Sequence, residues 1–354
     1  MGRIGIGVLS WAHGHVNAYA SQIKGFDDAQ LRICWDDDEQ RGRANAEAFG
    51  IRYTPHVEDV LSRPDVDLVF VASETSKHAD LVVAAAHAGK AVALQKPMAL
   101  SLADCDRIIA AVESSGVWFS LCFQMRYDPA NRRMKELVQG GALGKVGVLR
   151  RRHCISVLFN EAFVKGPSRW HVDPAANMGM WMDDASHATD FIYWMLGAPC
   201  SVVAEIGNIL TNVAPDDTGC ALYRFPRGAL AILLNSSVTH AGENTTEIYG
   251  DRGVLIQNWG DGVSTPLAPL GAEAVRYYDS QQPERGWQPQ GIPVPAGHGE
   301  RINAVARHML DALRMGEPTV TARDGKVSTG MVLGAYRAAQ KGQRVVLPLA
   351  GDEE

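Results

Sequence analysis

Two segments far apart in the chain carry side chains that suit proton transfer. Lys96 lies between a glutamine and a proline, directly after the apolar run 91–94, while Asp183 and His187 open a helical stretch four residues apart. Residues at positions i and i+4 share one face of a helix. An ammonium group can polarise a substrate oxygen, and an imidazole can accept a hydroxyl proton near neutral pH. Within a nucleotide-binding βα array, these residues would suit hydride transfer between an alcohol or ketone and a nicotinamide.

Each of these residues also has an ordinary structural explanation. Lys96 could be a surface loop residue, Asp183 a helix cap and His187 a hydrogen-bonded core histidine, and Asp184 and Asp190 are alternative acids on the same helix. The proline after Lys96 fixes the backbone and lacks an N–H group, so the turn that presents the lysine should be rigid. Ligands of parallel sheets bind at the carboxyl ends of the strands. We therefore favour a functional Lys96, whereas the residues alone leave the catalytic and the structural interpretations of His187 and Asp183 open, and Asp183 could either orient the imidazole or share its proton.

The elements that must position these residues begin with strand and helix repeats over residues 1–123. Nearly continuous apolar strands alternate with helical segments that end at glycines. This pattern predicts a parallel sheet covered on both faces. The predicted strands are 4–9, 31–35, 66–72, 91–94 and 117–123. The first predicted helix ends near residue 24, and the others span 39–49, 57–61, 79–88 and 102–114.

The pattern changes after residue 125. Turn residues separate several β-rich segments, which predicts a mostly antiparallel sheet with one covered face. The expected fold is α/β, with an N-terminal Rossmann domain (1–123) and a C-terminal α+β domain (124–354) whose terminal helices could pack back on the first. The predicted helices are 129–138, 301–315 and 326–341, the strands are 146–158, 201–210, 218–225, 229–238, 245–249 and 254–258, and 260–298 is expected to be a loop or edge region.

Composition limits the partners of the chain. The 354 residues carry a formal net charge of −6 and no run of five basic residues, so nucleic acid is not an expected partner. The six cysteines form no C-x-x-C pair, and the N-terminus shows no apolar leader segment, so we expect a cytoplasmic protein. No stretch approaches 18 apolar residues, and we expect no contact with a membrane.

The first βα turn is where a dinucleotide would bind. Residues 7–15 read G-V-L-S-W-A-H-G-H, which is not a clean G-x-G-x-x-G, although Ser10, Ala12 and Gly14 are small enough for close approach. Asp36 ends the second predicted strand, where a carboxylate can bond an adenosine ribose and repel a 2′-phosphate. We therefore expect NAD rather than NADP. The alternative is that Asp36 belongs to a solvated turn and helix cap.

His13 and His15 permit a second interpretation. Metal-dependent hydrolases built on (β/α)₈ barrels carry an H-x-H pair after their first strand, but that fold requires βα units along the whole chain. The β-rich run 201–258 has no helix-length segment between its strands, so we expect no metal site.

Taken together, the motifs resemble the glucose–fructose oxidoreductase and inositol dehydrogenase (Gfo/Idh/MocA) family over nearly the whole chain. Members usually read E-K-P where this chain has Q-K-P, and many read D-x-G-x-H from the position of Asp183 to that of His187. The combination is specific although each motif is short. The stretches that carry it are P-D-V-D-L-V-F-V-A at 64–72 with His78, A-G-K-A-V-A-L-Q-K-P-M at 88–98, Q-M-R-Y-D-P at 124–129, G-A-L-G at 141–144 and M-D-D-A-S-H-A-T-D at 182–190.

The resemblance implies bound NAD(H) or NADP(H), a sugar or polyol substrate such as an inositol, and a homodimer or homotetramer that pairs through the C-terminal sheet. It implies Lys96, Asp183 and His187 as the catalytic set, and we expect His187 to accept the proton while Asp183 holds its ring. The expected cofactor contacts are Ser10, Trp11, His13, His15, Asp36, Ser73, His78, Gln95 and Lys96. The expected substrate contacts are Arg126, Tyr127, Trp170, Asp183 and His187.

Four positions depart from the family pattern. Ser10 stands near a usual glycine, Gln95 replaces the usual glutamate, the run before the helix reads N-M-G-M-W at 177–181, and Ala185 replaces the glycine of D-x-G-x-H. The last two changes touch the substrate pocket and leave the substrate open. An NAD-using glycosidase and a nucleotide-binding regulator are the alternatives. A regulator would not need the three proton-transfer residues, and their presence favours an enzyme.

Overall fold

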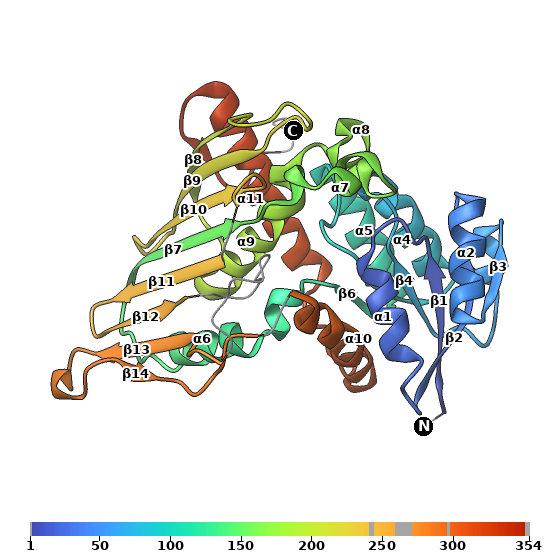
Figure 1. Cartoon of the computed structure of the whole chain (residues 1–354), viewed down its shortest axis with the longest axis horizontal. Coiled ribbons are helices and arrows are strands. Elements are labelled where there is room, and N and C mark those ends of the chain that lie inside the picture. Colours follow the sequence, from blue (N-terminus) through green and yellow to red (C-terminus); the bar gives the residue numbers. More distant parts are fainter. Residues whose placement is uncertain (1, 241–243, 259–270, 296–297, 351–354) are drawn as a thin grey trace.

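The computed structural model describes residues 2–240, 244–258, 271–295 and 298–350. Its described strands form two sheets that lie at opposite ends of the molecule, with helices between them (Figure 1). No helix among these residues combines the length and the apolar composition that a membrane span requires.

The first sheet has six parallel strands in the order β3-β2-β1-β4-β5-β6. The chain runs outward from β1 to β3 on one side and from β4 to β6 on the other, so the direction of winding reverses between β1 and β4. The crevice at the carboxyl ends of such strands is the usual ligand site. The strands are β1 (Ile4–Leu9), β2 (Ala29–Trp35), β3 (Arg52–Thr54), β4 (Leu68–Val71), β5 (Ala91–Leu94) and β6 (Phe119–Leu121).

Helices join these strands as the βα repeats predict. Glycines in the left-handed conformation follow α2 and α5, which explains why glycine marks the helix ends in the sequence. The helices are α1 (His15–Ile23), α2 (Glu39–Phe49), α3 (Val57–Leu61), α4 (His78–His87), which follows the short 3₁₀ turn η1 (Thr75–Lys77), and α5 (Leu102–Ser115). The parallel sheet is confirmed, and β3 is the one strand of it that the sequence pattern missed.

The second sheet has nine strands in the order β14-β13-β12-β11-β7-β10-β9-β8-β15. All neighbouring pairs are antiparallel except β7 and β10, which run parallel, so the expected mostly antiparallel sheet is confirmed. The strands are β7 (Val146–Cys154), β8 (Ser201–Gly207), β9 (Thr218–Arg224), β10 (Leu230–Ser236), β11 (Asn244–Gly250), β12 (Gly253–Gln257), β13 (Val275–Asp279), β14 (Gln288–Pro289) and β15 (Val345–Val346).

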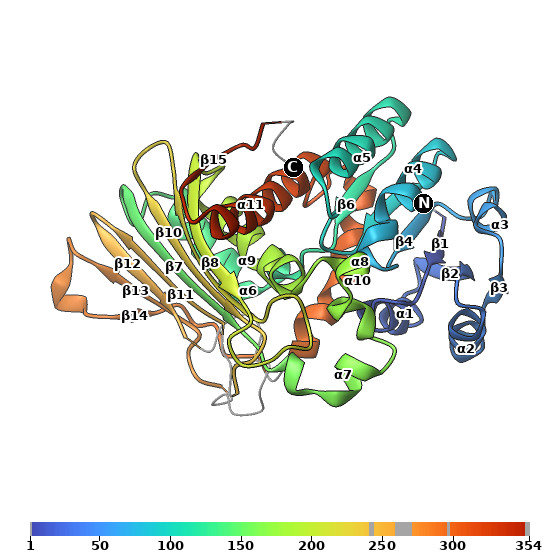
Figure 2. The ribbon, with the colours of Figure 1, turned by 90° about the horizontal axis from the view of Figure 1, so that it is seen from above.

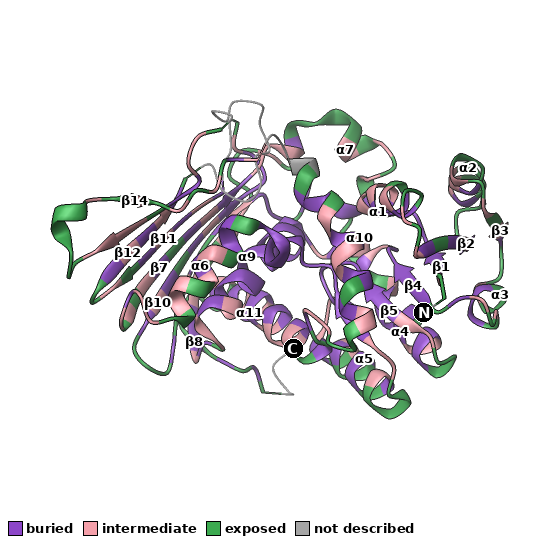
Figure 3. Ribbon diagram, turned by 90° about the horizontal axis from the view of Figure 1, so that it is seen from below, coloured by how far each residue is buried: buried purple, intermediate pink, exposed green. Residues whose placement is uncertain are grey.

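Helices cover one face of this sheet, as expected from the alternating pattern (Figure 2). The covering helices are α6 (Pro129–Gln139), α9 (Met180–Leu196) and α11 (Ala322–Lys341), and α9 is buried along most of its length (Figure 3). On β10, Ala231 and Leu233 point into the core while Ile232 is 42% exposed. The alternation of apolar and polar residues along these strands therefore indicates a sheet with one open face.

The chain returns to the first sheet through α10 (His298–Met315). Val305 and Met309 share a buried cluster with Ile6 and Val8 of β1. The Asp28 carboxylate, just before β2, accepts hydrogen bonds from Arg307 and Arg314 of α10. These two guanidinium groups lower the pKa of the Asp28 carboxyl to about 2. Apolar packing and ion pairs thus both fix α10 to the first sheet.

Three expectations from the sequence need correction. The strand expected over 146–158 ends at Cys154, and the chain then forms short helical turns that cross toward the first sheet: η3 (Val157–Phe159), α7 (Glu161–Lys165), η4 (Arg169–Val172) and α8 (Pro174–Asn177). The segment expected as a loop over 260–298 contains β13 and β14, while 260–270 and 296–297 lie outside the described residues. Helix α11 begins earlier than predicted, because Thr321 and Asp324 form a capping box.

The closest approach of α9 to the sheet gives a prediction. Trp181 is buried on Gly219 of β9, where an added Cβ would stand 2.6 Å from the indole Cε3 atom. We expect Gly219→Ala to reduce the free energy of unfolding by about 1–3 kcal/mol through overpacking. Thermal or denaturant unfolding measures it. Gly207→Ala on neighbouring β8 is the matched control, because no heavy atom lies within 4 Å of its added Cβ. Equal stability of the two variants would contradict the proposed contact.

Candidate active site

A cavity of about 460 Å³ lies where the carboxyl ends of the first sheet meet α9 and the second sheet. It brings together Lys96, Asp183 and His187, which the sequence placed in two distant segments. Most of its lining residues have polar side chains, and five of them are histidines. The polar lining residues are His13, His15, Lys96, Gln124, His153, Ser156, Asn160, Ser168, His171, Asp183, Asp184, His187 and Asn244.

A buried ion pair crosses this cavity. Lys96 follows β5 and its Nζ donates to Asp183 Oδ1 at 3.0 Å and to the Asp183 carbonyl at 3.2 Å. Only 4% and 5% of the two side chains is exposed. Burial opposes the ionisation of Asp183, but the Lys96 ammonium and His171 outweigh it and lower the pKa of the Asp183 carboxyl. The pair therefore fixes the lysine at the end of its strand.

Asp183 does not hold His187, contrary to the expectation from the sequence. The i, i+4 spacing puts both side chains on the cavity side of α9, but the Asp183 carboxylate bonds the nearby ammonium instead. The His187 ring packs against Phe123, with 6.0 Å between ring centroids, and against His153 at 5.8 Å. His187 still lines the cavity and can meet a bound substrate.

Asp184 faces the same cavity from the next position of α9. Its Oδ2 accepts a hydrogen bond of 2.5 Å from Ser237 Oγ, just after β10. Burial, followed by the charge of Asp183, raises the pKa of the Asp184 carboxyl to about 7. The sequence identified Asp184 only as an alternative acid, and the Ser237 contact gave no local signal because 53 residues separate the two.

Three histidines form the wall nearest the first βα turn. The His13 and His171 ring centroids lie 5.4 Å apart, and those of His13 and His15 lie 4.4 Å apart. His13 Nδ1 accepts the His15 backbone N–H, while no partner for Nε2 exists among the described residues. Burial, then the charges of His15 and Lys96, lowers the pKa of His13 far below its usual value. A neutral His13 thus carries its proton on Nε2 as a buried donor.

The first turn fits a dinucleotide despite its missing glycines. Ser10 adopts φ = 72°, the left-handed conformation that glycine usually supplies. A Cβ added at Gly14 would find no heavy atom of the described residues within 4 Å, which leaves room just before the N-terminus of α1. Backbone N–H groups at a helix N-terminus favour phosphate, and His13 Nε2 adds an unused buried donor. These features suit the diphosphate of NAD.

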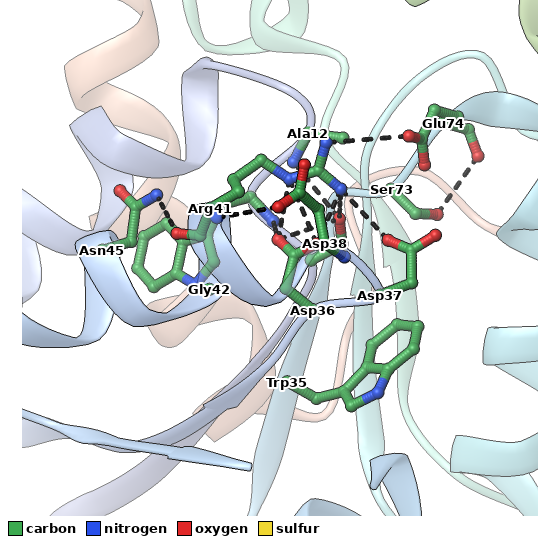
Figure 4. Close-up of polar contacts among 12 residues, drawn as sticks. Ala12, Trp35, Asp36, Asp37, Asp38, Arg41, Gly42, Asn45, Ser73 and Glu74 are labelled. Carbon is green, nitrogen blue, oxygen red and sulfur yellow. Dashed lines mark hydrogen bonds and ion pairs between the residues drawn. The ribbon is translucent and has the colours of Figure 1, made fainter. Parts of the chain in front are cut away.

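The carboxylate expected to bind the adenosine ribose is already covered by an arginine (Figure 4). Asp36 is 1% exposed and accepts hydrogen bonds from the Trp11 N–H at 2.7 Å and from Arg41 Nε at 2.9 Å. Arg41 also lies 3.1 Å from Asp37 and 3.7 Å from Glu74. The sequence missed Arg41, although it lies one helical turn beyond the acidic run. A ribose could reach Asp36 only if the guanidinium moves.

Several expected cofactor contacts build the turns instead of lining the cavity. The His78 ring nitrogens face the carbonyls of Pro97 at 2.9 Å and Ser73 at 3.2 Å, so the ring joins the turns after β4 and β5. Ser73 Oγ donates to the Glu74 carbonyl. The Gln95 amide accepts from the Lys96 N–H and donates to the Tyr19 hydroxyl. Ser73, His78 and Gln95 therefore hold the backbone that presents Lys96.

Two expected substrate contacts lie away from the cavity. Arg126 forms two hydrogen bonds with Asp190, at 3.0 and 2.6 Å, and both side chains are buried. Tyr127 stacks on His308 of α10 with 4.7 Å between ring centroids. These partners occupy polar atoms of Arg126 and a ring face of Tyr127, so both side chains make packing contacts here.

Trp170 reaches the first turn from η4. Its indole Nε1 donates to the Ala12 carbonyl at 3.1 Å, and its ring stacks on His171. The segment missed by the sequence analysis therefore brings His171 and Trp170 to the turn expected to bind the cofactor. Within the described ranges, no group of three or more His, Cys, Asp or Glu side chains is arranged to hold a metal ion.

Comparisons with known proteins agree with this architecture. Residues 1–123 match the model of an oxidoreductase family with an NAD-binding Rossmann fold, and residues 131–256 match the GFO/IDH/MocA C-terminal domain. Myo-inositol 2-dehydrogenase of Thermotoga maritima is 30% identical over 264 residues, covering 72% of this chain and 73% of that protein. D-Apiose dehydrogenase of Paraburkholderia graminis is 26% identical over 351 residues, covering 97% and 88%.

Solved structures show the same fold. A levoglucosan dehydrogenase in complex with NADH and levoglucosan gives a TM-score of 0.83 at 20% identity, and the match covers 98% of this chain and 100% of that one. With both sheets, both family domains and a relative of 30% identity in agreement, the chain belongs to the Gfo/Idh/MocA family of NAD-binding oxidoreductases.

Proposed function

We propose that this protein is an NAD-dependent dehydrogenase that oxidises a hydroxyl group of a sugar or polyol, or reduces the corresponding ketone. The observation that carries the proposal is the convergence of the buried Lys96–Asp183 pair and His187 in one cavity, beside a turn that fits a dinucleotide. Relatives named myo-inositol and scyllo-inositol dehydrogenases support the polyol class.

The residues divide the chemistry between them. Two acceptors of Asp183 hold the Lys96 ammonium, which has three donors in all, so one remains for a substrate oxygen. Such a preorganised cation stabilises negative charge on that oxygen as its proton leaves. His187 lines the same cavity and would accept the proton on its imidazole. Bound nicotinamide would supply the hydride acceptor, and the residues of the 10–15 turn would hold its diphosphate.

The alternatives explain the site less well. A nucleotide-binding regulator would not require two buried charges in its cavity, because burying an ion pair carries a desolvation cost. An NAD-using glycosidase would use the same fold and would release free sugar without accumulating NADH. A spectrophotometric screen of inositols, aldoses, sugar acids and glycosides with NAD, together with an assay for released sugar, tests all three functions. Turnover of no compound by a protein that binds NAD would reject the dehydrogenase.

We further propose a division of the chain into domains at 123/124, a cytoplasmic location, and a homodimer or homotetramer that pairs through the open face of the second sheet. Ile232 of β10 and Tyr249 of β11, which are 42% and 39% exposed, support that pairing surface. They stand on the face opposite to the covering helices, where a second copy could bury them.

Removal of the ammonium should abolish turnover. We expect Lys96→Ala to lower kcat by roughly two or more decades while the Kd for NAD changes little, because the lysine acts on the reacting oxygen. Steady-state kinetics and nucleotide titration measure the two effects. The variant leaves Asp183 buried without its cation, so Lys96→Ala/Asp183→Asn, which removes both charges, controls for instability. A kcat near that of the native protein would reduce Lys96 to a structural role.

The imidazole of His187 should carry the pH dependence of oxidation. The rate should increase with pH as the base loses its proton, and His187→Ala should remove this rise and slow oxidation by roughly two to four decades. Asp184 also titrates near neutral pH, so the kcat profile of Asp184→Asn is the control. A rise that persists in His187→Ala and disappears in Asp184→Asn would assign the base to Asp184.

The acidic corner should select NAD over NADP. Asp36, Asp37 and Glu74 surround Arg41, so a 2′-phosphate would meet a guanidinium that is already neutralised. We expect Asp36→Asn to narrow the difference between the Kd for NAD and the Kd for NADP, because it frees Arg41 to bind the 2′-phosphate. Adding Arg41→Ala should then weaken NADP binding again. Tighter binding of NADP than of NAD by the native protein would contradict this selectivity.

A further inference from the structure

We propose that Asp184, held by Ser237, binds a hydroxyl group of the substrate away from the reacting carbon and selects substrates that carry this hydroxyl. The inference rests on the proposed dehydrogenase function and concerns the wall of the cavity beside the second sheet. Neither the sequence motifs nor the catalytic set assign a role to these two residues.

The two adjacent aspartates of α9 have separate partners. Asp183 Oδ1 bonds Lys96 at the end of β5, whereas Asp184 Oδ2 bonds Ser237 after β10. One carboxyl group is therefore directed to the first sheet and the other to the second. Since a single lysine already neutralises Asp183, Asp184 remains available for a different contact.

Asp184 has an unused oxygen in the cavity. Its side chain lines the cavity although the residue is only 6% exposed, and Oδ1 makes no hydrogen bond to any residue that the structure describes. Because Asp184 lines the cavity, a hydroxyl group of a bound substrate could donate to this oxygen, while the 2.5 Å bond from Ser237 fixes the orientation of the carboxyl group.

The strand arrangement adds further polar groups to this wall. Because β7 and β10 run parallel, their carboxyl ends lie together, with His153 near the end of one strand and Ser237 just beyond the other. Asn244 at the start of β11 pairs with His153 across the antiparallel ladder. Its amide oxygen accepts the Cys154 N–H at 3.1 Å, which leaves its NH₂ group as a donor. Together these residues form a wall suited to hydroxyl groups.

The charges around Asp184 allow it to both donate and accept. Asp183 on its own helix and Asp216 before β9 favour its neutral form, whereas Lys96 and the Ser237 hydroxyl favour the ionised form. His153 and His187 face the cavity from β7 and α9. Burial is the largest of these effects, and it raises the pKa of the Asp184 carboxyl to about 7. A sugar hydroxyl, which also donates and accepts, fits either protonation state.

The experiment uses the full-length protein with NAD and the best substrate of the polyol screen. Asp184→Ala should raise KM by about 10- to 100-fold, as expected for the loss of a hydrogen bond to a charged group, with a smaller effect on kcat. Asp184→Asn, which retains hydrogen bonding, should restore part of the loss. The deoxy analogue that lacks the selected hydroxyl should bind to the Asp184→Ala variant and to the native enzyme with equal affinity.

Ser237→Ala tests the positioning role separately and should raise KM less than Asp184→Ala. Ser236→Ala is the matched control on the same strand, because its hydroxyl bonds Thr218 across the sheet. The Kd for NAD should not change in any of these variants. If Asp184→Ala does not fold, the Asp184→Asn and Ser237→Ala variants test the proposed role of Asp184 in its place, since neither leaves a cavity in the core.

Unchanged KM and unchanged selectivity in folded Asp184 and Ser237 variants would overturn the inference and leave the dehydrogenase function intact. A Ser236→Ala effect equal to that of Ser237→Ala would also overturn it, because the change would then reflect the strand and not the contact. If the native protein binds NAD but oxidises no polyol, the function itself fails and the inference with it.

Discussion

The ion pair between Lys96 and Asp183 is the contact on which the arrangement of the site depends. It joins the end of a parallel strand in the first sheet to a helix that covers the second, and both side chains are almost fully buried. Desolvation makes such a pair expensive unless its geometry is good and its remaining donors find partners. Here two donors of the lysine bond one residue, and the third has no hydrogen-bond partner among the residues that the structure describes.

The turns around this pair keep their shape by different means from those usual in dinucleotide-binding folds. Ser10 takes the left-handed conformation without being glycine. The Asp36 carboxylate bonds the Trp11 N–H and thereby closes the same turn. Arg41 covers that carboxylate in turn. The carboxylate expected to bind ribose thus also stabilises the turn itself, which links cofactor recognition to local folding.

The sequence predicts elements and their ends better than it predicts partners. Strand ends and helical periodicity were enough to bring Lys96, Asp183 and His187 to one cavity. The assignment of Asp183 to His187 was wrong because the spacing fixes which side chains share a face but not which of several neighbours binds more strongly. The carboxylate of Asp183 instead bonds the ammonium of Lys96, which follows β5 of the first sheet.

The residues missed by the sequence share one property, which is that distant segments create their environment. His171 lies in a connecting segment without apolar periodicity, and it reaches His13 only because the chain crosses back over the first turn. Asp184 acquires its partner from β10, and Arg126 loses its expected role because Asp190 binds it. Local pattern carries no information about such pairings, whereas the topology of the two sheets determines them.

The position of α9 explains how one helix can serve two walls of the cavity. Its Trp181 rests on a glycine of β9, and its start is fixed by the Trp181 N–H bond to Asp216. With the helix held at this distance from the sheet, consecutive residues bond different partners: Asp183 bonds Lys96 after β5, and Asp184 bonds Ser237 after β10. Changes at the strand ends could therefore alter substrate selection while the lysine and its aspartate stay in place.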